Sequence, residues 1–119
     1  MNQKNEERSV FLNDVSHIEH RIDTENIRLK KLGTAQEYLT KLKESVDKCS
    51  ELLSRSLEPG AEQEKFNNLI MESNRNYTKA YDSFEEHFEV VRKRVENLNA
   101  ERENIISEYE KSVQDEEKD

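Results

Sequence analysis

Residues 70–109 decide the fold, and they read IMESNRNYTKAYDSFEEHFEVVRKRVENLNAERENIISEY. Apolar side chains recur here at every seventh position, and a companion row follows each of them by four positions. The first row holds Ile70, Tyr77, Phe84, Val91, Leu98 and Ile105, and the second holds Tyr81, Phe88, Val95 and Tyr109, with Asn74 and Arg102 as polar interruptions. An apolar residue about every 3.5 positions forms a stripe along one side of a helix, which leaves water only against another helix. The sequence therefore predicts a long helix of the coiled-coil type.

One segment near the middle of the chain has the composition of a turn, and it reads SLEPGA over residues 56–61. Pro59 has no amide hydrogen with which to continue a helix, and Gly60 readily takes a backbone conformation with positive φ. The arms on either side are nearly equal, at roughly residues 8–56 and 62–113. Two equal helices around a tight turn predict an all-α fold, an antiparallel two-helix hairpin.

We expect this hairpin to be a single domain over residues 1–119, with frayed ends at 1–7 and 114–119. Folding it between Glu58 and Pro59 places residue i opposite roughly residue 117 − i. Arg102 then falls level with Asp14, where a carboxylate could meet its charge.

The first arm carries an apolar stripe of its own, with one change of frame. One frame holds Phe11, Val15, Ile18, Ile22, Leu29 and Leu32, and the other holds Ala35, Leu39, Leu42, Val46, Cys49 and Leu53. The frames differ by a three-residue stammer, and Gly33 lies at the fault. Thr34 and Glu37 follow it with the spacing of a capping box. A kinked continuous helix and a true break near Gly33 both fit, and the equal arms favour the kink. Cys49, on the stripe, is interpreted as a small buried hydrophobe.

The composition limits the functions open to the chain. Its 119 residues carry a net charge of −8, with 39% charged and 32% apolar residues. An acidic chain without a basic stripe is not expected to bind nucleic acid, and no apolar run reaches the roughly 18 residues of a membrane span. The N-terminal residues lack the apolar stretch of a cleaved signal peptide. The expected location is the cytoplasm, with export by a leaderless route together with a partner as the alternative.

The chain presents no set of residues suited to catalysis. Asp14 and His17 have the i, i+3 spacing of helical metal ligands, but a di-metal bundle needs a matching pair on another helix. Carboxylates are instead paired with bases at helical spacing, as in Glu37 and Lys41. We therefore expect neither an enzyme, nor a metal site, nor a cofactor.

A single seam between two helices is a thin core for a chain of this length. Bulky aromatic side chains would stay half exposed against one helix, and a second hairpin would cover them in a helical bundle. The partner is then another helical protein or a second copy of the chain. The candidate partner-binding seam residues are Val15, Ile18, Ile22, Leu29, Leu39, Leu42, Val46, Tyr77, Tyr81, Phe84, Phe88, Val91, Val95, Leu98 and Ile105, with Pro59 and Gly60 in the turn.

The spacing of these residues also carries a family resemblance. It runs from Ile18-x3-Ile22 to Leu42 in the first arm, and then through Phe66-x10-Tyr77-x3-Tyr81, Val91, Val95, Leu98 and Ile105 in the second. Over roughly residues 10–112 it resembles the WXG-type proteins of Gram-positive type VII secretion, and more closely the small helical proteins that partner LXG-domain toxins. The resemblance implies a non-enzymatic targeting factor or chaperone that binds the helical N-terminal domain of an LXG toxin for secretion.

The chain departs from that family at two places. It has no tryptophan, so residues 57–60 read LEPG where the family has Trp-x-Gly. The only match to the family's export signal, Tyr-x-x-x-Asp/Glu, is Tyr81 with Glu85, inside the apolar stripe, where packing explains the tyrosine better. The alternative function is therefore a self-associating structural coiled-coil or scaffold protein.

Overall fold

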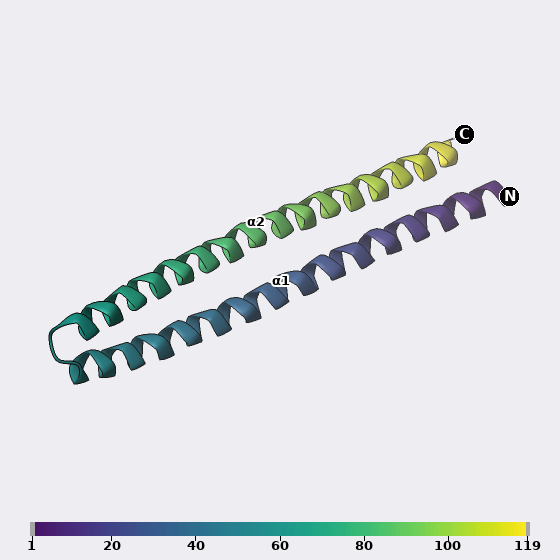
Figure 1. Ribbon diagram of the computed structural model, residues 1–119. Coiled ribbons are helices and arrows are strands. Elements are labelled where there is room, and N and C mark those ends of the chain that lie inside the picture. Colours follow the sequence, from purple (N-terminus) through teal and green to yellow (C-terminus); the bar gives the residue numbers. More distant parts are fainter. Residues whose placement is uncertain (1, 119) are drawn as a thin grey trace. The chain divides into compact units, whose positions relative to one another are not determined.

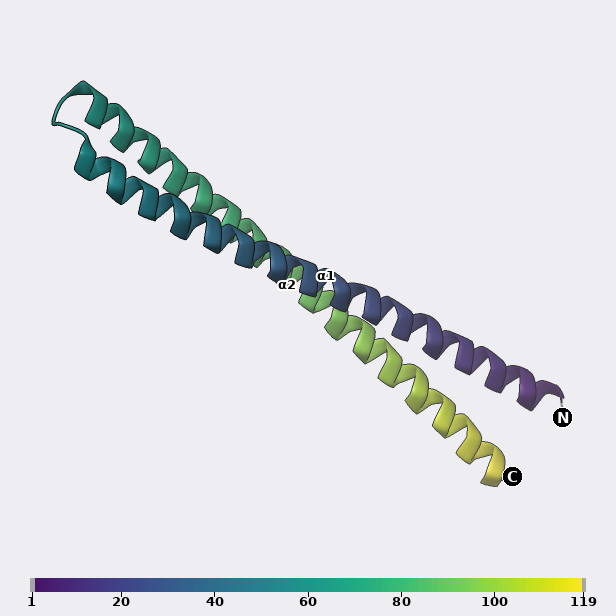
Figure 2. The same cartoon turned by 90° about the horizontal axis from the view of Figure 1, so that it is seen from below.

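The computed structural model describes residues 2–118, which form two long helices, α1 (Asn2–Ser56) and α2 (Ala61–Lys118) (Figure 1). Residues 57–60 join them, and the described chain contains no strand. The prediction of an all-α two-helix hairpin is confirmed. Figure 2 shows α1 as one unbroken coil, so it continues through Gly33 and the alternative of a break there is wrong.

Both helices are longer than predicted. α1 begins at Asn2 rather than near residue 8, and α2 ends at Lys118 rather than near residue 113. An established helix gains one backbone hydrogen bond with each added residue, which favours its extension into polar ends. Lys4 also lies 3.8 Å from the carboxylate of Glu116 on the other helix. Residues 2–7 and 114–118 are therefore helical, and residues 1 and 119 lie outside the described chain.

The turn lies where the proline and glycine predict it. The Leu57 amide donates to the Leu53 carbonyl at 3.1 Å, and the Glu64 amide donates to the Gly60 carbonyl at 3.1 Å. These two bonds mark the last turn of α1 and the first turn of α2. Gly60 has a φ of +154°, which strains any residue that carries a Cβ. Glycine therefore completes the reversal, and both Pro59 and Gly60 are exposed.

The chain divides into two compact units, and each takes part of both helices. The terminal unit contains the described residues up to Leu29 and from Val90 onwards, and the turn unit contains Lys30–Glu89. The most buried side chains, Ile18, Val91 and Leu98, are 4–6% exposed. All three belong to the terminal unit, which therefore holds the best-formed part of the core.

Within each unit the helices run antiparallel in one register. Six contacts between the helices define this register, and in each the two residue numbers add up to 119–121. They are Lys4 with Glu116, Phe11 with Tyr109, Glu19 with Arg102 and Glu25 with Arg94 in the terminal unit, and Gln36 with Glu85 and Lys43 with Tyr77 in the turn unit. The sequence analysis expected a sum of 117, so its register differs from the observed one by about one helical turn. Arg102 consequently meets Glu19, with 3.2 Å between Nε and Oε1, rather than Asp14.

Candidate protein-binding surface

The seam of α1 in the turn unit follows a single heptad frame, without the predicted stammer. Its partly buried members, spaced three, four or seven residues apart, are Leu32, Gln36, Leu39, Lys43, Val46, Ser50 and Leu57. Leu39, Val46 and Leu53 stand at positions that this frame shares with the predicted one, although Leu53 is exposed. The other seam positions are filled by Gln36, Lys43 and Ser50, which the search for apolar residues passed over. The prediction of a frame change at Gly33 is therefore wrong.

The local geometry around Gly33 agrees with an uninterrupted helix. Thr34 does not cap a new helix with Glu37, because its hydroxyl donates to the Lys30 carbonyl at 3.1 Å, one turn back. Such a bond is typical of threonine inside a helix. A Cβ built on Gly33 meets no atom within 4 Å, so close packing does not require glycine there.

Each polar seam residue of the turn unit has a partner. Gln36 Nε2 donates to Glu85 Oε1 at 2.8 Å, across to the other helix. Lys43 Nζ donates to both carboxylate oxygens of Asp47, at 2.7 and 2.8 Å, and lies 5.5 Å from the centre of the Tyr77 ring. Ser50 Oγ donates to the Val46 carbonyl at 2.7 Å. Partners of this kind let polar residues occupy a seam, because buried polar groups without them are costly.

In the terminal unit, every predicted seam residue is at least partly buried. These residues are Val15, Ile18, Ile22 and Leu29 of α1, and Val91, Val95, Leu98 and Ile105 of α2. The sequence analysis missed Glu25, whose side chain is 13% exposed and lies 3.0 Å from Arg28 and 3.8 Å from Arg94. Its buried Oε2 accepts no hydrogen bond, and the longer ion pair with Arg94 offsets the cost of burying that oxygen. The position of Glu25 in the heptad pattern, between Ile22 and Leu29, could have predicted its place in the seam.

In the turn unit, the predicted seam residues divide into two groups. Leu39, Val46, Tyr77, Phe84 and Phe88 are partly buried. Leu42 is 62% exposed and Tyr81 is 37% exposed. Leu42 precedes the true seam residue Lys43 by one position, which turns its side chain toward the outside of the seam. The prediction that Leu42 lies inside the seam is therefore wrong, whereas Tyr81 lies at the edge of the seam, in a hollow that Gln36 and Thr40 of α1 also line.

Exposed apolar residues of α1 in the turn unit form a surface that we call the α1 flank. It consists of Tyr38, Leu42, Cys49, Leu52 and Leu53. Tyr38 is 71% exposed, Leu52 is 64% exposed and Leu53 is 50% exposed. Cys49 is exposed as well, so the prediction of a buried cysteine is wrong, for the same reason as for Leu42: it stands one position before a seam residue, Ser50.

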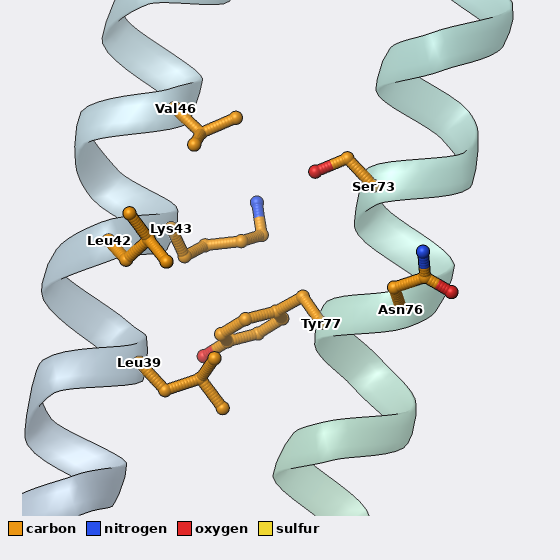
Figure 3. A pocket seen from close by; sticks show the side chains of 7 residues that line it. All are labelled: Leu39, Leu42, Lys43, Val46, Ser73, Asn76 and Tyr77. Atoms are coloured by element: carbon orange, nitrogen blue, oxygen red, sulfur yellow. The ribbon is translucent and has the colours of Figure 1, made fainter.

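An apolar groove adjoins the α1 flank (Figure 3). It has a volume of about 220 Å³ and is lined by Leu39, Leu42, Lys43 and Val46 of α1 and by Ser73, Asn76 and Tyr77 of α2. The Tyr77 ring extends from α2 toward Leu39, and the Lys43 side chain extends toward α2. Leu42 belongs both to the flank and to the groove wall. The flank and the groove therefore form one continuous surface.

Two other kinds of feature were sought among the described residues, a cluster of metal ligands and a membrane-spanning helix. It contains no group of three or more His, Cys, Asp or Glu side chains placed to hold a metal ion. Among the same residues, neither helix includes a stretch apolar enough to cross a membrane. No protein-family model, curated protein or solved structure matches this chain. Function is therefore inferred from the exposed surfaces of the two helices.

Proposed function

We propose that this chain is a non-enzymatic helical protein whose function is to bind another protein. The observation that carries the proposal is the exposed α1 flank, which includes Tyr38, Leu42 and Leu52, each more than 60% exposed. Scattered apolar residues on a surface need no explanation, but several that adjoin an apolar groove mark an interaction site. Burial of a leucine or tyrosine side chain against a partner gains about 1.5–3 kcal/mol each, which is enough to support binding.

We further propose, from the family resemblance, that the partner is the helical N-terminal domain of an LXG toxin. The chain would then act as a targeting factor or chaperone for type VII secretion. The nearly equal lengths of α1 and α2 and the net charge of −8 support this proposal. A helical partner also suits the surface, because an amphipathic helix fits an apolar groove between two helices.

Co-expression tests both proposals. The full chain is produced with the N-terminal domain of an LXG toxin encoded beside its gene, and the mixture is separated by size-exclusion chromatography with light scattering. A complex of defined stoichiometry at micromolar concentration supports the proposed function. Separate elution of the two proteins contradicts the toxin assignment.

The same measurement on the chain alone tests the alternative, a self-associating structural protein. The exposed α1 flank is the observation that favours this alternative, because a second copy of the chain could also cover it. A stable dimer that does not exchange its subunits for the toxin domain would replace the proposed function with a structural one. A monomer that binds the toxin domain would exclude the alternative.

A further inference from the structure

We propose that the turn unit binds one amphipathic helix of a partner protein, and that acidic side chains border the apolar stripe of that helix. The site consists of the α1 flank, the adjoining groove and a row of basic residues on α1. This inference rests on the proposed function, because it names the place and the chemistry of the binding that the proposed function requires.

The charged residues of α1 in the turn unit form two neighbouring rows along the helix. The acids Glu37, Glu44 and Glu51 stand seven residues apart and therefore share one side. The exposed bases Lys41, Lys48 and Arg55 also stand seven residues apart, and each follows one of these acids by four residues, so the two rows are neighbours. The basic row therefore lies between the acidic row and the α1 flank.

The basic row borders the α1 flank. Lys41 follows Tyr38 by three residues, Lys48 precedes Leu52 by four, and Arg55 follows Leu52 by three. Residues three or four apart are neighbours on a helix surface. None of the acids of α1 in the turn unit, Asp47 included, stands three or four residues from any member of the flank. A ligand on the flank therefore meets positive charge along the outer edge of α1.

The opposite edge of the site is formed by α2 and is uncharged at the groove. Ser73 and Asn76 line the groove from that side (Figure 3). Leu69, one helical turn before Ser73, is 63% exposed and extends the apolar surface of α2 toward the turn. The α1 flank runs from Tyr38 to Leu53, which at 1.5 Å per residue is roughly 22 Å. A partner helix of about four turns matches this length.

The distribution of charge favours a different protein over a second copy of this chain. A symmetric dimer uses the same surface on both subunits. Flank against flank, with the two copies of α1 antiparallel, would bring two rows of Lys41, Lys48 and Arg55 together, and like charges across an interface oppose association. A helix with acidic borders instead places its carboxylates beside these three bases.

Two synthetic peptides of about 21 residues test the inference on the full chain. Both carry the same leucine stripe, and its borders are glutamates in one peptide and lysines in the other. We expect the glutamate-bordered peptide to bind at least tenfold more tightly at low salt, and the preference to shrink at high salt because ions screen exposed charges. Equal binding of the two peptides at low salt would overturn the inference.

Charge reversal locates the site. The variant K41E/K48E/R55E is expected to invert the preference between the two peptides. The matched control R21E/K93E/K111E makes the same change in net charge at exposed residues of the terminal unit, and is expected to leave the preference intact. Circular dichroism checks that both variants remain helical. An unchanged preference in the first variant, or the same inversion in both, would overturn the inference.

Cys49 supplies an independent readout, because the only cysteine of the chain lies within the flank. The bound glutamate-bordered peptide is expected to slow the reaction of Cys49 with a maleimide at least tenfold. No protection by the bound peptide, or protection in the chain alone together with a dimer in light scattering, would overturn the inference. The second of these results would assign the flank to a second copy.

The toxin domain separates this inference from the proposed function. If the toxin domain binds K41E/K48E/R55E as tightly as it binds the native chain, the inference fails and the proposed function stands. If the toxin domain binds neither chain, the toxin assignment fails, and the two peptides still decide whether the flank selects acidic helices.

Discussion

The contrast between Leu98 and Leu42 gives the sharpest test of the seam described above. Leu98 is 6% exposed and Leu42 is 62% exposed, although both were predicted to lie inside the seam. Replacing leucine by alanine removes three carbon groups, each worth about 0.8 kcal/mol when buried. Scaled by burial, the loss is about 2.3 kcal/mol at Leu98, and a residual cavity raises it to about 3 kcal/mol. At Leu42 the loss is about 0.9 kcal/mol, and the better helix propensity of alanine offsets about 0.2 kcal/mol of it.

Urea unfolding followed by circular dichroism measures both variants. We expect Leu98→Ala to lower the free energy of unfolding by about four times as much as Leu42→Ala, with an unchanged dependence on urea concentration. Leu39→Ala is the control within the turn unit, since Leu39 is partly buried and stands only three residues from Leu42; its cost should fall between the other two. If Leu42→Ala costs as much as Leu98→Ala, the single heptad frame of α1 is wrong.

Four further changes test other features by the same unfolding measurement. Gly33→Ala should stabilise the chain by about 1 kcal/mol, because a Cβ has free space inside a continuous helix; destabilisation would indicate a break. Gly60→Ala should cost about 1–3 kcal/mol, because φ is +154° there, and a neutral result would exclude strain in the turn. Lys43→Leu should stabilise by about 1 kcal/mol, because it places an apolar side chain at a seam position and removes the desolvation of a charge; a loss of stability would mean that the bonds to Asp47 outweigh that gain. Glu19→Gln should cost less than about 1 kcal/mol, with the difference vanishing in high salt, since the Arg102 pair is exposed; a larger, salt-independent loss would contradict this.

The second helix could be predicted well because its apolar residues keep one frame. From Tyr77 to Ile105 the apolar residues mark only one side of the helix as the seam, and that side is buried at Val91 and Leu98. The turn could be predicted equally well, because a proline followed by glycine near the midpoint of a helical chain indicates a chain reversal. The all-α hairpin follows from these two features together.

The seam of the first helix could not be read from apolar residues alone. Leu39 and Val46 fit two frames, and Leu42 and Cys49 draw the pattern toward the wrong one. Pairing with α2 decides between the frames, and it selects the frame that contains Lys43. A search for seven-residue spacing that allowed polar members would have found Gln36, Lys43 and Ser50 between Leu29 and Leu57. The exposure of Leu42 and Cys49 in the α1 flank is the direct result of this choice, so it too was hidden from the sequence analysis.

The placement of the buried core has a consequence for how the folded chain fluctuates. Ile18, Val91 and Leu98 all belong to the terminal unit, whereas the turn unit keeps its large apolar side chains partly or largely in water. Segments with few buried contacts open more often, and amide hydrogen exchange reports such opening. Amide exchange should therefore be slowest around residues 18 and 98 and faster beside the turn, although the turn connects the two helices covalently. A protein bound to the flank would reduce the opening of the turn unit. Slower amide exchange in that unit would then report its binding.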